Sequence, residues 1–159
     1  MPETAPRILS ALPADAEELL ALQRLAYRSE AELYGDWNIP PLTQTLAELR
    51  GAFAALTILK AVEDAAIVGS VRAGLEGGVC RVGRLMVRPD RQRRGLGAAL
   101  LAAIEARFPQ AARFALFTGC ESAGNLRLYA RCGYLETARS AAGPGPELIF
   151  LEKPGPAAG

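Results

Sequence analysis

The sequence predicts a mixed α/β domain whose sheet is mostly antiparallel and whose helices cover both faces of that sheet. Three apolar runs separated by short turns predict an antiparallel meander, and they cover residues 56–63, 66–75 and 79–87. A helical period over 95–108 then leads to another apolar run at 114–118, which predicts a parallel strand–helix–strand crossover. The domain therefore combines an antiparallel half with one parallel connection.

The remaining segments predict a helical first third and a short hairpin near the end. In order, we expect a strand at 7–10, one helix over 13–34, a loop over 36–41 stiffened by two prolines, and a helix over 45–52 opened by a capping box. After the crossover we expect a helix over 122–132 and paired strands at 134–138 and 147–152, joined through residues 143–146. We see no repeat, so residues 1–153 are expected to form a single domain and residues 154–159 a disordered tail.

The composition argues against several classes of function. The chain has 159 residues, of which 50% are hydrophobic, a formal net charge of +1, no histidine and three cysteines. The near-neutral charge predicts no nucleic-acid or membrane partner, and the missing histidines exclude Ser-His-Asp and Cys-His catalysis and disfavour a metal site. Neither a signal peptide nor an apolar run of membrane-spanning length is visible, so we expect a cytoplasmic protein that needs no metal.

The stretch at 82–101 joins the end of a predicted strand, a short turn and the start of a predicted helix. Gly95 and Gly97 lie at that helix start, where unpaired backbone N–H groups and the positive end of the helix dipole attract an anion. The arginines that crowd this region are Arg81, Arg84, Arg88, Arg91, Arg93 and Arg94. Asp90 is the single acid in the same stretch, so the local charge is strongly positive. This excess of arginine indicates a polyanionic ligand that carries phosphate groups.

Two other interpretations of this stretch stay open. A glycine-started helix with an arginine-rich turn also occurs as an ordinary solvated loop. The arginines are also compatible with RNA binding, which would weaken steeply with salt, although few aromatic side chains lie near them to stack on bases.

Two motifs resemble those of one enzyme family. Gln92-Arg93-Arg94-Gly95-Leu96-Gly97 matches the (Arg/Gln)-x-x-Gly-x-(Gly/Ala) motif of the GNAT superfamily of N-acetyltransferases, and Leu85-Met86-Val87-Arg88-Pro89 looks like that family's fourth strand and its exit. Asn125-Leu126-Arg127-Leu128-Tyr129 and Gly133-Tyr134 are spaced like the family's second signature. These motifs span residues 79–135, and the order of elements extends the resemblance over nearly the whole chain.

The resemblance implies that acetyl-CoA is the co-substrate and that two parallel strands splay apart to admit its pantetheine arm. Pyrophosphate would lie on the backbone N–H groups of residues 92–98, beside the arginines. Pantetheine would pair with residues 85–87 like an added strand, and an N–H near Met86 would stabilise the oxyanion. The cofactor-binding residues predicted in this way are Leu85, Met86, Val87, Gln92, Arg93, Arg94, Gly95, Leu96, Gly97, Ala98 and Asn125.

The resemblance also implies a catalytic role for Tyr129, as the acid that gives a proton to the departing thiolate. A phenol has a pKa near 10, slightly above that of a typical thiol, so the transfer is chemically reasonable. The alternative is a tyrosine that only packs its helix against the sheet. Asn125 likewise has two interpretations, either a contact to pantetheine or a residue that caps or opens the same helix.

The general base on the acceptor side is less well defined. Many family members carry a glutamate on the fourth strand, but residues 79–87 hold Arg81 and Arg84 and no carboxylate. A base could come from a water chain or from acids elsewhere, and the candidates are Glu30, Glu32, Asp36 and Glu76.

The loop at 36–41 has two interpretations. Trp37, with Ile39, is expected to anchor this loop on the core, as an apolar side chain commonly does. Alternatively, Tyr27, Tyr34 and Trp37 wall an acceptor pocket, since loops on a rigid scaffold often carry specificity.

These observations lead to one hypothesis and one alternative. We expect an acetyl-CoA-dependent N-acetyltransferase that acts on a primary amine of a small molecule or peptide by direct attack in a ternary complex. The alternative is a non-catalytic acyl-CoA-binding sensor or interaction module, which the missing strand carboxylate motivates. The sequence leaves open the identity of the amine, the use of acyl groups other than acetyl, and whether the protein forms a homodimer.

Overall fold

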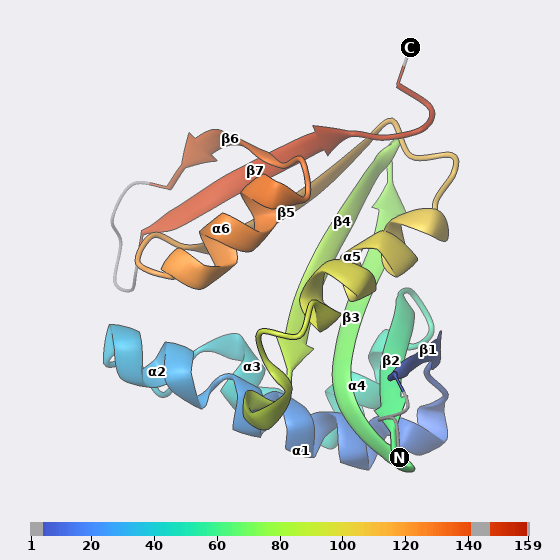
Figure 1. Cartoon of the computed structure of the whole chain (residues 1–159), viewed down its shortest axis with the longest axis vertical. Coiled ribbons are helices and arrows are strands. Elements are labelled where there is room, and N and C mark those ends of the chain that lie inside the picture. The colour runs from blue at the N-terminus through green and yellow to red at the C-terminus, as the bar shows by residue number, and fades with distance from the viewer. Residues whose placement is uncertain (1–4, 141–146, 159) are drawn as a thin grey trace.

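The computed structural model describes residues 5–140 and 147–158, and within them seven strands form one sheet (Figure 1). The strands are β1 (Arg7–Ser10), β2 (Thr57–Glu63), β3 (Ala66–Glu76), β4 (Val79–Val87), β5 (Arg113–Gly119), β6 (Leu135–Arg139) and β7 (Leu148–Pro154). Their order is β1-β2-β3-β4-β5-β7-β6, and β4 and β5 are the one parallel pair among the described strands. The predicted mixed, mostly antiparallel sheet is confirmed. The predicted connection at 143–146 lies outside the described residues.

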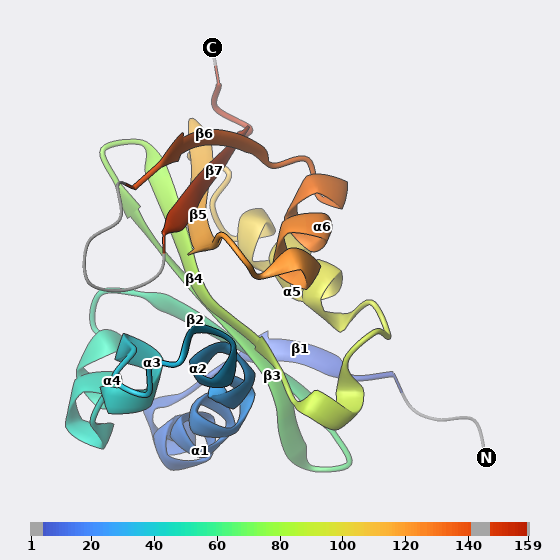
Figure 2. The same cartoon turned by 90° about the vertical axis from the view of Figure 1, so that its left-hand side faces the viewer.

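Helices lie on both sides of the sheet, as predicted (Figure 2). On one side are α1 (Ala16–Ala26), α2 (Arg28–Tyr34), α3 (Pro40–Thr43) and α4 (Leu46–Ala52). On the other side are α5 (Leu96–Ala106) and α6 (Ala123–Arg131). Two short 3-10 turns, Pro13–Asp15 and Pro89–Arg91, precede α1 and α5 respectively.

Each face of the sheet has its own apolar core because side chains alternate along the strands. The buried stripe of α5 consists of Leu96, Leu100, Leu101 and Ile104. It packs on β3 to β5, where Val71, Val82 and Phe114 share its cluster. On the opposite face, α1 buries Leu19 against Ile67 of β3 and other residues of a second cluster.

The single first helix that the sequence predicts is divided in the structure. α1 ends at Ala26 and α2 begins at Arg28, while Tyr27 between them has φ −88° and ψ 2°. Backbone hydrogen bonds continue across the bend, from the Tyr27 N–H to the Gln23 oxygen and from the Ala31 N–H to the Tyr27 oxygen. No proline or glycine marks the bend in the sequence. The division accompanies a tertiary contact, because Glu30 and Tyr34 of α2 are hydrogen bonded to Ser122 at the start of α6.

The two prolines predicted to stiffen a loop open a helical turn instead. Pro40 and Pro41 occupy the first positions of α3, where a helix has no use for the missing N–H group. Gln23 of α1 holds this turn, since its Nε2 donates to the Pro41 oxygen at 2.9 Å. The predicted capping box of the next helix is present, with the Glu48 N–H donating to Thr45 Oγ1 at 3.1 Å.

The segment predicted as a disordered tail differs from that expectation over residues 154–158. The Gly155 N–H donates to the Ala112 oxygen at 2.8 Å, and the Ala157 N–H donates to the Ala111 oxygen at 2.9 Å. A Cβ on Gly155 would overlap the Ala111 carbonyl, so the segment lies tightly against the turn before β5. Backbone hydrogen bonds alone fix these residues, which explains why no apolar pattern reveals them.

β4 and β5 meet at one end and separate toward the other (Figure 1). Their ladder joins Val79 to Arg113 and ends with Arg81 opposite Ala115, although both strands continue. The predicted splay of the two parallel strands is therefore present.

A bulge lies in the separated part of β4. Ser70 pairs with Met86 and Arg72 pairs with Gly83, so Arg84 and Leu85 of β4 stand opposite a single residue of β3. Arg84 has φ 47°, a left-handed conformation that is uncommon for arginine. A bulge bends its strand and strengthens the local twist, which helps to carry the end of β4 away from β5.

Candidate active site

The turn between β4 and α5 presents backbone N–H groups. After the 3-10 turn, Arg93 and Gly95 adopt left-handed conformations with φ 65° and 79°, and α5 then begins at Leu96. No side chain of the described residues caps this helix. The N–H groups of its first turn can therefore receive an anion, which is the geometry that the predicted phosphate site requires.

Ion pairs fix the shape of this turn and use part of the arginine cluster. Arg88 Nε donates to Asp90 Oδ1 at 2.6 Å, and Arg91 Nη1 donates to Asp90 Oδ2 at 2.9 Å. Arg91 Nε also donates to Glu63 Oε2 of β2 at 3.1 Å. Arg88 and Arg91 thus form ion pairs within the protein. The negative charge of a ligand would be neutralised mainly by other arginines of the cluster.

The predicted cofactor residues of the turn divide into exposed and packed ones. Gln92, Arg93 and Arg94 are exposed, and Gln92 Nε2 lies 3.4 Å from the Val87 oxygen. Leu96 is buried and belongs to the core under α5. Its side chain therefore packs in the core and supports the turn, and its backbone N–H is the part that can bind a ligand.

Gly97 has a packing role in addition to the predicted close approach of a ligand. A Cβ there would lie 3.0 Å from Leu128 Cδ2, so the glycine lets α6 come close to the first turn of α5. Ala98, the next residue, is partly exposed. The contact between the two helices brings Asn125 and Tyr129 of α6 toward the turn between β4 and α5. This turn, residues 88–95 with the first N–H groups of α5, is called the anion turn below.

Leu85, Met86 and Val87 form the end of β4 that has left β5. Leu85 and Val87 pack toward the core under α5, and Met86 points into the opposite core. The ladder to β5 ends at Arg81, so the backbone edge of these residues has no partner in β5. Such an edge can pair with an extended ligand in the manner of an added strand.

Tyr129 lies between α6 and the sheet, with 6% of its surface exposed. Its ring stands edge-on to that of Tyr134, with centroids 6.1 Å apart, and the Tyr134 hydroxyl donates to Glu105 Oε2 at 2.8 Å. Burial, with further contributions from Tyr27 and Glu30, raises the pKa of Tyr129. The phenol thus packs the helix, as the alternative interpretation predicts, and it also stays protonated and able to donate.

A hydrogen-bonded cluster joins α2 to the start of α6. Ser122 Oγ donates to the Glu30 carboxylate at 3.0 and 3.1 Å, and the Tyr34 hydroxyl lies 2.8 Å from the same Oγ. Asn125 Nδ2 lies 3.5 Å from Glu30 Oε1. Because Asn125 and Tyr129 are four residues apart on α6, they share one face of that helix. Glu30 is therefore held about one helical turn from Tyr129.

Asn125 lies in the first turn of α6, and Ser122 occupies the N-cap position. The Asn125 amide bridges Glu30 to Thr118 Oγ1, 3.2 Å away near the end of β5. It thus ties the end of β5 to α2. Its predicted contact with a cofactor stays a prediction.

The structure distinguishes the four candidate bases. Glu32 is exposed, and Asp36 closes a turn within its own loop. Glu76 lies beside the start of β4, whereas the open edge lies at the end of β4. At about 3.3 Å per residue, β4 is about 30 Å long, so Glu76 is remote from that edge. Of the four, Glu30 is the one hydrogen bonded to α6 and the one whose charge acts on Tyr129.

Trp37 does not anchor its loop on the core, because 53% of its surface is exposed. That expectation is wrong for Trp37, because the segment is held instead by the buried Pro41 and by the hydrogen bond from Gln23 to the Pro41 oxygen. Tyr27 and Tyr34 are both partly buried beside Glu30. The alternative, in which aromatic residues wall an acceptor pocket, stays a prediction.

Two arginines that carry no motif form a second group beside Tyr27. Burial raises the pKa of Tyr27 to about 12, opposed by the charges of Arg84 and Arg72 and reinforced by that of Glu30. Burial, together with the charge of Arg84, lowers the pKa of Arg72 to about 10. Sequence reasoning missed Arg72, and it counted Arg84 in the arginine cluster of the predicted phosphate site and noted it where a strand carboxylate is often found. The available signal was an arginine in the mostly apolar middle of each of two neighbouring strands.

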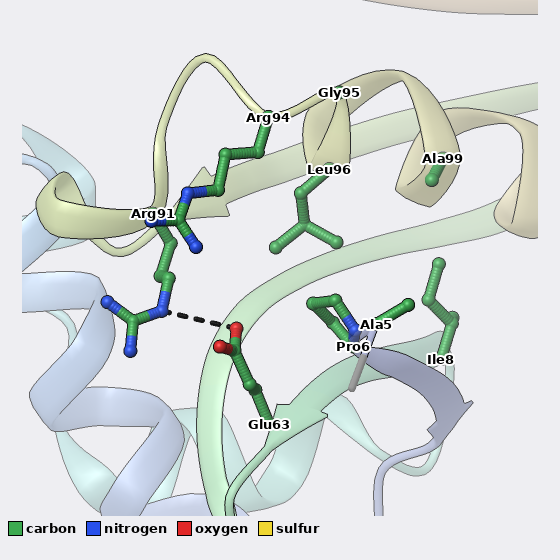
Figure 3. Close-up of a pocket in the computed structure, with 9 residues that line it drawn as sticks. All are labelled: Ala5, Pro6, Ile8, Glu63, Arg91, Arg94, Gly95, Leu96 and Ala99. Atoms are coloured by element: carbon green, nitrogen blue, oxygen red, sulfur yellow. Dashed lines mark hydrogen bonds and ion pairs between the residues drawn. The ribbon is translucent and has the colours of Figure 1, made fainter. Parts of the chain in front are cut away.

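A cavity of about 310 Å³ lies on the other flank of α5 (Figure 3). Its wall is formed by Ala5, Pro6, Ile8, Glu63, Arg91, Arg94, Gly95, Leu96 and Ala99. The cavity borders the anion turn, but β5 and α6 do not contribute to it. Its carboxylate, Glu63, is already paired with Arg91. The opening between β4 and β5 differs from this cavity, because the carboxylate of Glu30 and the phenol of Tyr129 are near each other there.

The cysteines and acids suggest no further chemistry. Cys80, Cys120 and Cys132 are free thiols, and burial raises the pKa of Cys80 to about 11. Within residues 5–140 and 147–158, no three or more His, Cys, Asp or Glu side chains gather as a metal site. In the same residues, no helix has the length and apolar character to cross a membrane.

The sequence matches the family model described as "Acetyltransferase (GNAT) family" over residues 17–134. This match covers most of the chain and includes Glu30, the anion turn and Tyr129. The chain belongs to this GNAT family. The resemblance inferred from the two motifs is therefore confirmed.

Solved GNAT structures share the fold of this GNAT chain. PaiA N-acetyltransferase from Thermoplasma acidophilum, in complex with coenzyme A, has a TM-score of 0.80 at 16% identity over 95% of this chain and 99% of that one. YncA, a putative acetyltransferase from Salmonella typhimurium with its cofactor acetyl-CoA, has a TM-score of 0.74 at 20% identity over 95% and 94%. At these identities the likeness shows the fold. No curated protein matches the chain significantly.

Replacing Gly119 by alanine tests whether the cluster between α2 and α6 organises the GNAT site. A Cβ at Gly119 would overlap the hydroxyl and ring of Tyr34, so Tyr34 must move away from Ser122. We expect acetyl transfer to fall at least tenfold and the free energy of unfolding to fall by about 1 kcal/mol as hydrogen bonds are lost. Gly124→Ala is the matched control, because the space around its Cβ is open. Equal activity and stability of the two variants would contradict this role.

Proposed function

We propose that this GNAT protein is an acetyl-CoA-dependent N-acetyltransferase that acetylates a primary amine by direct attack in a ternary complex. The observation that carries the proposal is the convergence of the anion turn, Glu30 and Tyr129 where β4 and β5 separate. An anion site can hold the donor, a carboxylate can accept a proton, and a protonated phenol can donate one. These are the groups that acyl transfer from a thioester to an amine requires.

The turn before α5 fits the pyrophosphate of coenzyme A. The space around the Gly95 Cα is open, the first-turn N–H groups of α5 are uncapped, and Arg93 is exposed beside them. The free edge of residues 85–87 fits the amides of pantetheine. When bound, acetyl-CoA supplies an activated acetyl group. A backbone N–H near Met86 would then stabilise the negative charge that develops on the carbonyl oxygen.

Glu30 acts as the general base in this proposal. The amine nitrogen forms the new bond to the acetyl carbon and must lose a proton, which the Glu30 carboxylate accepts directly or through Ser122 Oγ at 3.0 Å. Ser122 and Asn125 both donate to this carboxylate and so fix its orientation. The base therefore comes from α2, which accounts for the missing carboxylate on β4.

Tyr129 acts as the general acid, giving its proton to the sulfur as the carbon–sulfur bond breaks. Burial raises the pKa of Tyr129, which by itself makes the phenol a weaker acid. Burial acts in the same direction on a thiol, and elsewhere in this protein it raises the pKa of Cys80 to about 11. A thiolate that leaves in apolar surroundings is accordingly a stronger base than in water, so the two pKa values stay close enough for proton transfer.

The names of structural neighbours cover two kinds of acceptor. A ribosomal-protein-S18-alanine N-acetyltransferase from Escherichia coli has a TM-score of 0.72 at 17% identity over 94% of this chain and 93% of that one. A phosphinothricin acetyltransferase from Sinorhizobium meliloti, in complex with acetyl-CoA, has a TM-score of 0.75 at 16% identity over 95% and 89%. The fold thus serves both protein and small-molecule acceptors, and the acceptor proposed here is a small-molecule or peptide amine.

Acetyl-CoA binding and thiol release test the proposed function. We expect acetyl-CoA to raise the melting temperature by an amount that grows with its concentration, because it binds the folded state alone. A panel of amines should then include some that release free thiol above the rate of hydrolysis. No thermal shift at millimolar acetyl-CoA would overturn the proposal. A shift without thiol release for any amine would instead favour the acyl-CoA-binding sensor.

Tyr129→Phe tests the general acid. The substitution removes one buried hydroxyl and keeps the ring that packs against Tyr134, so acetyl-CoA binding should be retained. We expect kcat to fall by about 10² or more, the usual contribution of a positioned acid. Burial raises the pKa of Tyr129, so the tyrosine stays protonated below about pH 10. Its deprotonation should therefore cause no fall in wild-type kcat below that pH. An unchanged kcat in the variant would remove Tyr129 from this role.

Glu30→Gln tests the general base, with Glu32→Gln on the same helix as its control. Glutamine can still accept the hydrogen bond from Ser122, so the link to α6 should survive while the proton acceptor is lost. We expect kcat/KM for the amine to fall by about 10² in the Glu30 variant. The exposed Glu32 should be replaceable without effect. Equal rates in both variants would show that another group or water takes the proton.

A further inference from the structure

We infer that the acceptor is an amino acid whose free carboxylate binds Arg72 and Arg84. This inference rests on the proposed function and names the substrate class of the same site. It begins from two guanidinium groups, one on β3 and one on β4, that the proposed acetyl transfer does not use.

Arg72 and Arg84 are charged side chains with unmet hydrogen-bonding capacity. Arg72 Nη1 and Arg84 Nε are buried and have no hydrogen-bond partner. Their charges oppose each other, and no acidic side chain of the described residues forms an ion pair with either. Buried guanidinium groups are normally paired with an acid, because the desolvated charge is otherwise costly. An incoming anion would neutralise both charges.

The pair lies beside the predicted reaction centre. Arg72, Arg84 and Met86 line the same small cavity under α1, and Met86 belongs to the free edge of β4. Arg84 has its left-handed backbone in the bulge, between the paired residues Arg72–Gly83 and Ser70–Met86, and this places it in the same group as Arg72. Both residues remain partly exposed, so a ligand can reach atoms of these arginines other than the buried Arg72 Nη1 and Arg84 Nε. Bulges next to active sites often aim a side chain in this way.

Tyr27 lies within electrostatic range of both these arginines and the proposed base. Its pKa responds to the positive charges of Arg84 and Arg72 and to the negative charge of Glu30, so all three lie near its ring. The site thus has a carboxylate and two cations near the same tyrosine. An amino acid matches this pattern, with its amine directed to Glu30 and its carboxylate to the arginines. Guanidinium groups suit carboxylates particularly well because they can donate two parallel hydrogen bonds.

The test compares molecules that differ only in the carboxylate. The substrates are a set of L-amino acids and their primary amides, assayed by thiol release from acetyl-CoA. Amides are less basic at the amine, which favours their reactive neutral form, so a preference for the acids cannot come from the amine. In parallel, N-acetyl-L-amino acids and their amides are titrated calorimetrically into the protein saturated with coenzyme A. The titration measures binding without turnover.

Arg72→Met and Arg84→Asn remove the two charges. Methionine keeps most of the apolar stem of Arg72, and asparagine tolerates the left-handed backbone at position 84. Removing either member of a half-buried, mutually repelling pair should leave the melting temperature near that of the wild type. Arg81→Met is the matched control, since Arg81 is exposed at the far end of β4, 3.8 Å from Glu76.

We expect the wild type to prefer acids over amides at least tenfold in kcat/KM and in binding. That preference should disappear in the Arg72 and Arg84 variants and persist in the Arg81 variant. Amides that react and bind as well as acids would overturn the inference, and so would a preference that survives both substitutions. If only amides, or only amines without a carboxylate, release thiol, the protein is an acetyltransferase and this inference is refuted. If no amine releases thiol, the proposed function fails, and the calorimetric titration still decides whether the arginines bind a carboxylate.

Discussion

β4 and β5 stay paired over three residues of each strand and then separate. Beyond that point the peptide groups of one strand no longer hydrogen bond to those of the other. The ends of both strands are nevertheless held in place. β5 pairs with β7 along its whole length, and β4 keeps β3 as its neighbour up to Val87. The bulge at Arg84 bends β4 at the point where the strands have already separated. The opening is therefore built into the sheet, and the helices are arranged around it.

Each helix at the opening depends on that separation. α5 begins beside the free end of β4, and Gly97 allows α6 to approach its first turn. α6 follows the free end of β5 and brings Asn125 and Tyr129 to the opening. α2 reaches the same place from the opposite side of the sheet because the chain bends at Tyr27. The predicted donor site, a phenol and a carboxylate thus come from three helices that meet where the sheet divides.

The sequence predicts well those features that neighbouring residues determine. The strands of the meander, the helix that starts at Leu96 and the capping box at Thr45 all depend on short-range periodicity or on contacts three or four residues apart. The contact of Glu30 with Ser122 joins residues 92 positions apart, and no local pattern reveals it. For this reason Glu30 could be named only as one of four bases, and the bend at Tyr27 could not be foreseen at all.

The central claim is that the acetyl donor lies in the opening between β4 and β5 with its sulfur next to Tyr129. A crystal structure of the protein with acetyl-CoA tests this claim most directly. The claim predicts pyrophosphate on the first turn of α5, pantetheine along residues 85–87, and the thioester sulfur within hydrogen-bonding distance of the Tyr129 hydroxyl. An acetyl group in the cavity lined by Ile8 and Glu63, or a sulfur remote from Tyr129, would contradict it.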